Sequence, residues 1–431
     1  MKRLLTSLLL ALAAMFAVHA QDPFGEHRYS GFRLAPTDEN STVFVGNSIT
    51  NMQEWGEALQ CGDVKGRGVS STISERILHH VENLVAGKPK RIFLLVGTND
   101  LAPVYGVPVD EYARNMRCIV SRIRHESPAT EIYIQSILPS TNTGRSLEKE
   151  QQANDSLKKI CSEEGLTYVN LWDTLYPMCQ GNTKYTRDQL HPTAYGYNVW
   201  LRQIISYLPE CSVAYPSDFT PSYPSMPQAA AGMMLGQYEQ LPLSQGDMLF
   251  IGDEVANGAE WRDIFHSARV KNRGNGWNYA WYAIANLRTG IPYILGNGKG
   301  DKVSKIFLHA GINEVSSGMT LANFKTAYNG LISDIKARTQ APICVLSVVP
   351  CNDAAKNQSY VIPYNNALKE ICAADARLTF VDCYDKLADG STAKVSCIKD
   401  NMVYAEGYLR MAQALEAEVK AADADAYVWT D

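Results

Sequence analysis

Short apolar segments alternate with longer amphipathic segments along the first half of the chain. The apolar segments are rich in Val, Ile, Leu and Phe, which favours buried strands, whereas the amphipathic segments have the periodicity of helices. Because strands that alternate with helices assemble into parallel sheets, the pattern predicts an α/β fold with helices on both faces of a parallel sheet. The predicted strands lie near residues 42–46, 91–96, 131–137 and 167–171, and the predicted helices near 72–86, 110–125, 147–163 and 193–207.

The second half of the chain repeats short stretches of the first half in the same order. The offset is 206 positions between Gly46 and Gly252, and it drifts to 214 between Gly97 and Gly311. A repeat of so long a period predicts two homologous domains in tandem. The matching stretches are 44–48 with 250–254, 65–68 with 271–274, 92–100 with 306–314, 136–139 with 347–350, and 154–161 with 365–372.

The chain ends and the stretch between the repeats complete the predicted organisation. Residues 1–20 start with two basic residues, continue as an apolar stretch and end in small residues, as a signal peptide does. No later segment has eighteen uninterrupted apolar residues, so we predict no membrane span and expect an exported protein, periplasmic or extracellular. The other predicted segments are a polar lead-in at 21–40, a first domain at 41–208, an ordered surface linker without clear periodicity at 209–246, and a second domain at 247–425.

The composition restricts the partners of the protein. Its 40 basic and 45 acidic residues give a net charge of −5, and no basic run is long enough to follow a phosphate backbone, which argues against nucleic acid. The 10 cysteines match no zinc pattern, and both disulfides and buried free thiols fit their spacing.

Ser48 is a candidate nucleophile because it follows a predicted buried strand, where parallel α/β sheets carry their chemistry. Asp188 precedes His191 by three positions, just before a predicted helix. That spacing can place the carboxylate beside one imidazole nitrogen and leave the other free to take the proton of a serine hydroxyl. The alternatives are a plain turn or cap serine at Ser48 and a helix N-cap at Asp188.

Asn99 completes the set of candidate residues in the first half. It follows another predicted buried strand, and its amide can point at the oxyanion that forms when an ester carbonyl is attacked. Backbone N–H groups of the loop after the first strand can support it. An asparagine that merely caps a loop is the alternative.

Taken together, four blocks of the first half resemble those of the SGNH (GDSL) hydrolase superfamily. The resemblance implies two tandem three-layer α/β/α, flavodoxin-like domains with parallel sheets, and serine esterase chemistry without a metal or organic cofactor. It also implies oxyanion donors from the backbone of Ser48, from the Asn99 side chain and from the second block, where Ser71 occupies the usual glycine position and Gly68 is the alternative. The blocks are 46–49, 66–71, 97–100 and 188–192. Asn47 replaces the aspartate that is common before the nucleophile.

The second half lacks this chemistry. Superposing the repeats places Glu254 at the nucleophile and Val403 at the base, while Asp400 and Asn313 are retained. We predict a catalytically inactive domain; a glycosidase pair of Glu254 and Asp400 is the weaker alternative. The aromatic residues of this half suit sugar binding or core packing. The candidate substrate-binding residues are Trp55 of the first half and Trp277 of the second half. The aromatic run comprises Trp261, Trp277, Tyr279, Trp281 and Tyr282, and His309 is expected in the core.

The sequence therefore predicts a secreted serine esterase that removes O-acetyl groups from carbohydrate. Stretches 46–50 and 134–139 resemble secreted bacterial carbohydrate acetylesterases of the sialate O-acetylesterase kind, which implies sialic acid or another glycan as substrate. Two alternatives stay open. One is a glycan-binding or scaffold protein with a vestigial triad, and the other is a lipase or acyl-thioesterase that uses the same site.

Overall fold

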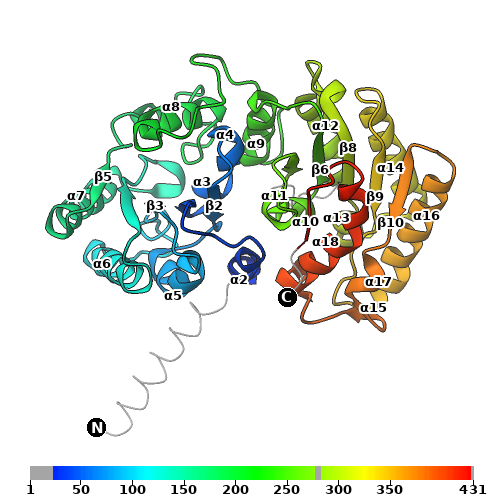
Figure 1. Ribbon diagram of the computed structural model, residues 1–431, viewed down its shortest axis with the longest axis horizontal. Coiled ribbons are helices and arrows are strands. Elements are labelled where there is room, and N and C mark those ends of the chain that lie inside the picture. Colours follow the sequence, from blue (N-terminus) through cyan, green and yellow to red (C-terminus); the bar gives the residue numbers. More distant parts are fainter. Residues whose placement is uncertain (1–22, 277–282, 429–431) are drawn as a thin grey trace, which may run out of the picture.

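Two five-stranded parallel sheets form the framework of the molecule (Figure 1). The computed structural model describes residues 23–276 and 283–428. Both sheets have the same order of strands, β2-β1-β3-β4-β5 in the first and β7-β6-β8-β9-β10 in the second. The predicted α/β class with parallel sheets is confirmed. The strands are β1 (Thr42–Gly46), β2 (Val64–Gly68), β3 (Arg91–Leu95), β4 (Glu131–Gln135), β5 (Thr167–Val169), β6 (Asp247–Gly252), β7 (Val270–Gly274), β8 (Val303–His309), β9 (Ile343–Leu346) and β10 (Leu378–Val381).

Helices flank both sheets, with one set for each half. In the first half they are α3 (Ser48–Asn51), α4 (Trp55–Ala58), α5 (Ser74–Val85), α6 (Val109–Glu126), α7 (Leu147–Glu164) and α8 (Ala194–Ile204). The second half has α10 (Glu254–Asn257), α11 (Trp261–Ile264), α12 (Ala283–Leu295), α13 (Ile312–Ser317), α14 (Leu321–Lys336), α15 (Ala354–Lys356), α16 (Ile362–Ala373), α17 (Tyr384–Leu387) and α18 (Ala405–Lys420). Two small hairpins, β11 (Ala388–Asp389) with β12 (Thr392–Ala393) and β13 (Ile398–Lys399) with β14 (Met402–Val403), precede α18.

Side chains of strand β1, which lies between β2 and β3, alternate between two apolar layers. Val43 and Val45 pack in a cluster with α5 and α6 on one face. Phe44 faces the other side, where its ring stacks on Trp55 of α4 with centroids 3.8 Å apart. Because successive residues of a strand point to opposite faces, one short apolar run fills both layers.

The predicted linker and lead-in both contain helices that pack between the halves. The linker includes α9 (Ala229–Gln240), whose Met233 and Leu235 are buried, so the expectation of a surface linker is wrong for this part. A helix buried on all sides shows no amphipathic periodicity, which is why the pattern did not predict it. The lead-in forms α2 (Pro23–Gly31), where Arg28 donates from Nη1 to the carbonyl of Gly258 at 2.9 Å. The predicted signal peptide lies outside the described residues.

The two halves meet through contacts that are reciprocal. Arg273 binds Glu57 with two hydrogen bonds of 3.0 and 2.7 Å, and both side chains are buried. The equivalent positions 206 residues away are Arg67 and Asp263, which approach to 3.9 Å, while Lys65 binds Asp263 at 2.6 Å. Contacts in which position i meets j and j meets i are those of an interface with two-fold symmetry. The halves are therefore packed around a pseudo-two-fold axis.

We expect Arg273→Met to lower the free energy of unfolding by about 3–5 kcal/mol, because it leaves the Glu57 carboxylate buried without its partner. The double variant Glu57→Gln/Arg273→Met should recover part of that loss, since it removes both charges. Urea unfolding followed by circular dichroism measures both. The control is Arg288→Met, whose partly exposed pair with Asp334 should contribute at most about 1 kcal/mol. An equal loss in Arg273→Met and the control would show that the buried pair does not hold the halves together.

Candidate active site

Ser48 is placed at the carboxyl edge of the first sheet by the turn that links β1 to α3. Asn47 caps α3, because its Oδ1 accepts from the backbone N–H of Ile49 at 3.0 Å. The cap therefore belongs to Asn47 and leaves the Ser48 hydroxyl available. At Gly46 a Cβ would lie 2.3 Å from the carbonyl oxygen of Leu95, so this close approach of the turn to β3 needs glycine.

A chain of hydrogen bonds joins Ser48, His191 and Asp188. The Ser48 Oγ lies 2.9 Å from His191 Nε2, and His191 Nδ1 lies 2.7 Å from Asp188 Oδ2. The other Asp188 oxygen accepts from the backbone N–H groups of Leu190 and His191 at 3.0 and 2.8 Å. Ser48 and His191 are 143 positions apart in the sequence. The fold brings them together with Asp188 in the order that the prediction requires.

Asp188 is held as a charged acceptor beside the imidazole. Burial works to raise its pKa, but the hydrogen bond and charge of His191 and the two backbone N–H donors outweigh burial and lower the pKa below its usual value. The N-cap of α8 is Thr193, whose Oγ1 accepts from the N–H of Gly196, so the alternative of Asp188 as a helix cap is wrong. The carboxylate is therefore free of the helix and serves His191.

Asn99 and Ser71 lie on the two neighbouring loops. The Asn99 Nδ2 donates one hydrogen to the carbonyl of Thr72 at 3.0 Å, and an amide nitrogen carries two. Ser71 has φ +62°, a left-handed conformation that favours glycine. Gly68 sits in β2, where a Cβ would lie 2.1 Å from the backbone nitrogen of Asn51, which explains this glycine by packing. The geometry thus favours Ser71 over Gly68 as the glycine-like position of the second block.

Arg145 is a residue of this site that the sequence did not predict. Its guanidinium donates from Nε to the carbonyl of Thr98 at 3.2 Å and from Nη2 to the Asn99 Oδ1 at 3.4 Å. Nη1 also donates to the carbonyl of Asn142 at 3.1 Å. Because the amide oxygen of Asn99 faces Arg145, the amide nitrogen is turned the other way. A single arginine in a polar loop between β4 and α7 matches no motif, so only the three-dimensional structure identifies it.

The corresponding turn of the second half carries Glu254 at the start of α10. Asp253 caps this helix through the N–H of Val255 at 3.0 Å, as Asn47 does in the first half. Asn313 donates to Glu254 Oε2 at 2.8 Å. Burial, together with the nearby Asp253 carboxylate, raises the pKa of Glu254 to about 7. His309 is buried as predicted and bonds Asp253 through Nδ1 at 2.8 Å.

The two tryptophans predicted as candidate substrate-binding residues differ in outcome. Trp55 is only 1% exposed, and its indole N–H donates to the carbonyl of Thr50 at 2.8 Å, so it is a core residue and the expectation is corrected. The repeat explains this, since Trp261 is buried in the same way and donates to Ala256 at 2.7 Å. Aromatic rings that fill the core leave no sequence signal to distinguish them from ligand-binding rings. Trp277, Tyr279, Trp281 and Tyr282 lie outside the described residues.

In residues 23–276 and 283–428, no group of three or more His, Cys, Asp and Glu side chains is arranged to hold a metal ion. No helix in the same part of the chain is long and apolar enough to cross a membrane.

All 10 cysteines are free thiols. Six of them are buried in the cores: Cys161, Cys344, Cys351, Cys372, Cys383 and Cys397.

Comparison with known proteins gives matches for the first half of the chain. Residues 44–199 match the model of the GDSL-like Lipase/Acylhydrolase family. A GDSL esterase/lipase of Arabidopsis thaliana is 27% identical over 194 residues, which cover 36% of this chain and 80% of the relative.

Solved structures give matches of similar extent. A GDSL-like lipase from Bacteroides thetaiotaomicron is 22% identical with a TM-score of 0.36, covering 42% of this chain and 98% of that one. A catalytic mutant of Axe2, an acetylxylan esterase from Geobacillus stearothermophilus, is 16% identical with a TM-score of 0.34, covering 40% and 95%. Over residues 44–199 the chain thus resembles the GDSL-like lipase/acylhydrolase family, and this similarity supports its assignment as a carboxylic ester hydrolase.

Proposed function

We propose that this protein is an exported serine esterase that removes acetyl groups from carbohydrate through a triad of Ser48, His191 and Asp188. The observation that carries the mechanism is the chain of hydrogen bonds of 2.9 and 2.7 Å that links the three side chains. A serine hydroxyl is a weak nucleophile unless a base accepts its proton, and the imidazole lies at the distance that this transfer needs.

The proposed reaction has two stages, the acylation of Ser48 and the hydrolysis of the acyl-enzyme. His191 Nε2 takes the Ser48 proton as Oγ attacks the ester carbonyl, and Asp188 stabilises the imidazolium that forms. The tetrahedral intermediate collapses when the C–O bond to the sugar breaks and His191 returns the proton to the sugar oxygen. Water then attacks the acetyl-serine with His191 again as base, which releases acetate and restores Ser48.

Three donors surround the position of the oxyanion in this proposal. They are the backbone N–H groups of Ser48 and Ser71 and the second hydrogen of the Asn99 amide. Arg145 acts as a positioning residue, because its hydrogen bond to Asn99 Oδ1 fixes which end of the amide faces the reacting carbonyl. Donors held in place before the reaction stabilise the developing charge without reorganisation.

The choice of acetylated carbohydrate as substrate is supported by the predicted signal peptide and by the motif resemblance to secreted carbohydrate acetylesterases. A lipase or thioesterase activity is the second candidate, since the plant relative is an esterase/lipase. The intact triad of one half argues against a purely structural or glycan-binding role.

Ser48→Ala should lower hydrolysis of p-nitrophenyl acetate and acetate release from acetylated sugars by about a thousandfold or more, because it removes the hydroxyl that lies 2.9 Å from His191 Nε2. Ser156→Ala is the matched control, because this half-buried serine of α7 bonds only to its own helix in the contacts given for it, and it should act like the wild type. A screen with acetylated sugars, long-chain esters and acyl thioesters identifies the substrate class. Equal rates for Ser48→Ala and wild type would refute the mechanism.

Arg145→Ala should lower kcat about tenfold to a hundredfold with little change in KM, since the Asn99 amide then keeps only its hydrogen bond to the Thr72 carbonyl and is held less firmly. Arg145→Lys should restore part of kcat. In the Asn99→Ala background the same Arg145→Ala change should have little further effect, because the group that it positions is gone. Fully additive losses in this double-mutant cycle would show that Arg145 does not act through Asn99.

Ser71→Val should lower kcat/KM for p-nitrophenyl acetate more than tenfold, because a β-branched side chain resists the left-handed backbone and displaces the proposed N–H donor. Ser71→Gly should instead raise the free energy of unfolding by about 1 kcal/mol, since glycine adopts this conformation without strain. Steady-state kinetics and urea unfolding test the pair. A fully active Ser71→Val variant would place the second oxyanion donor elsewhere.

A further inference from the structure

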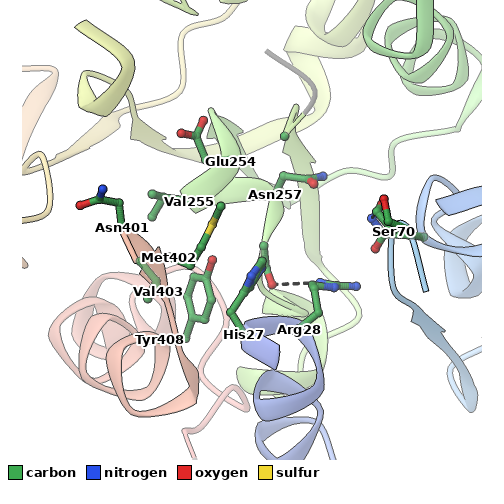
Figure 2. A pocket seen from close by; sticks show the side chains of 14 residues that line it. His27, Arg28, Ser70, Glu254, Val255, Asn257, Asn401, Met402, Val403 and Tyr408 are labelled. Carbon is green, nitrogen blue, oxygen red and sulfur yellow. Dashed lines mark hydrogen bonds between the residues drawn. The ribbon is translucent and has the colours of Figure 1, made fainter. Parts of the chain in front are cut away.

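A partly open pocket, the interdomain cavity, lies between the two halves and is lined by both of them (Figure 2). Its volume is about 170 Å³. An engineered protein cavity of about 150 Å³ holds one benzene molecule, so this space suits one six-membered ring. Figure 2 shows Asn401, Met402 and Tyr408 together on one side and Ser70 on the other, with His27 and Arg28 of α2 between them.

The cavity is built around the pseudo-two-fold axis. Asn51 and Asn257 both line it and are equivalent positions of the repeat, as are Ser70 and Gly276. The two sets therefore face each other across the interface that Arg273 and Glu57 hold together. Neither half forms the cavity alone.

On the side of the first half, the cavity reaches the loop of the proposed oxyanion hole. Ser71 lines the cavity, and Asn51 is the last residue of the short helix that Ser48 begins. Asn51 also donates to the Ser70 hydroxyl at 3.2 Å, which ties that helix to the loop. A ring in the cavity would thus lie beside the loop that carries Ser71 and the end of the helix that Ser48 begins.

On the side of the second half, the cavity is lined by the positions that have lost the reaction. Glu254 replaces the nucleophile, and Val403 replaces the base. Asn401 and Met402 come from the same hairpin as Val403, and Tyr408 from the helix that follows it. Without the serine and histidine, this surface presents a carboxyl group, amides and apolar atoms.

The charges around the cavity do not favour an ionic ligand. Arg28 already pairs with Glu260 at 2.7 Å and donates to the Gly258 carbonyl. Burial and the charge of Arg28 lower the pKa of His27 to about 3, so this ring is neutral at pH 7. The remaining ionisable group is the Glu254 carboxyl, which repels an anion when it is charged. A cation would be repelled by the positive charge of Arg28.

The polar groups that remain suit the hydroxyls of a sugar. Each hydroxyl donates one hydrogen bond and accepts others, and the Asn51, Asn257 and Asn401 amides also do both while the carboxyl of Glu254 accepts. Met402 and Tyr408 supply apolar surface of the kind that packs on the C–H face of a sugar ring. An apolar wall with a few placed polar groups is the usual composition of a small-molecule site.

We propose that this interdomain cavity binds one uncharged sugar ring of the substrate, with Glu254 and Asn401 of the second half as hydrogen-bond partners of its hydroxyls. The inference rests on the proposed esterase function and narrows the substrate to neutral acetylated sugars. The second half then contributes to substrate binding, although it has lost the nucleophile and the base.

Binding is measured by titration calorimetry on full-length Ser48→Ala protein, so that no substrate is consumed. The probes are mono-O-acetylated methyl glycosides of xylose, glucose and galactose, and the O-acetylated methyl glycoside of sialic acid. We expect at least one neutral sugar to bind at least tenfold more tightly than the sialic acid derivative. Adding Glu254→Gln or Asn401→Ala should weaken that binding at least fivefold, and the larger Met402→Trp should abolish it by filling the cavity.

The kinetic counterpart is the ratio of kcat/KM for the preferred acetylated sugar to kcat/KM for p-nitrophenyl acetate, which should fall at least tenfold in Met402→Trp. The matched control is Glu370→Gln, an exposed carboxylate of the same half that pairs with Lys325, and it should match the wild type in binding and in this ratio. Circular dichroism confirms folding of each variant. Unchanged sugar binding in Met402→Trp and Glu254→Gln, no binding of any neutral sugar, or preference for sialic acid would each overturn the proposal. Ester hydrolysis that survives Ser48→Ala would instead overturn the proposed function.

Discussion

The arrangement of the two halves depends on a guanidinium group that is buried at their interface. Arg273 is 1% exposed and binds both oxygens of the Glu57 carboxylate, so neither charge can be moved into water without separating the halves. A charge pair at this depth fixes an orientation more than it adds stability, because both groups have lost their hydration. The reciprocal contact of Asp263 with Arg67 and Lys65 acts from the other side of the pseudo-two-fold axis.

That orientation decides what the loops at the carboxyl edges of the sheets can do. The second-block loops follow β2 and β7, which are edge strands of their sheets, and the interface brings them toward each other. A rotation of one half would move Asn51 relative to Asn257 and change the shape of the cavity that both line. The interface charges and the α2 helix, through Arg28, therefore determine the shape of the cavity as well as the contact between the halves.

The sequence predicted the features that depend on local patterns. The strands near 42–46, 91–96, 131–137 and 167–171 correspond to β1, β3, β4 and β5, because buried parallel strands are continuous apolar runs. It did not predict β2, whose residues Val64-Lys65-Gly66-Arg67-Gly68 contain one apolar side chain. An edge strand pairs on one side only, so main-chain hydrogen bonds and neighbouring helices define it more than its own apolar residues do.

At the candidate site, the sequence identified the residues that belong to motifs with fixed spacing. It did not identify residues that reach the site only because of how the chain folds. Ser48, Asp188 and His191 occupy fixed positions in such motifs, and the structure places them within hydrogen-bond distance. Arg145 reaches Asn99 from a separate loop, and its position follows from how the segment between β4 and α7 folds over the sheet edge. Trp55 shows that the sequence can also predict a binding residue wrongly. The residue type alone does not distinguish a ring in the core from a ring that binds substrate.

The turn after the first strand of each half shows which part of this fold is needed for folding and which for the reaction. Gly46 and Gly252 are both retained, because a Cβ would overlap the carbonyl oxygen of the neighbouring strand, at 2.3 Å from Leu95 and 2.2 Å from His309. Asn47 and Asp253 both cap the short helix that follows. Only the next position differs in kind, with a serine in one half and a glutamate in the other. Since the backbone of the turn is fixed by the glycine and the cap, a side chain at this position can change from nucleophile to hydrogen-bond acceptor without altering the fold. The carboxyl of Glu254 therefore occupies a position at the interdomain cavity that the turn already fixes. Binding a substrate there requires only a hydrogen-bond acceptor, whereas the reaction would require a nucleophile and a base.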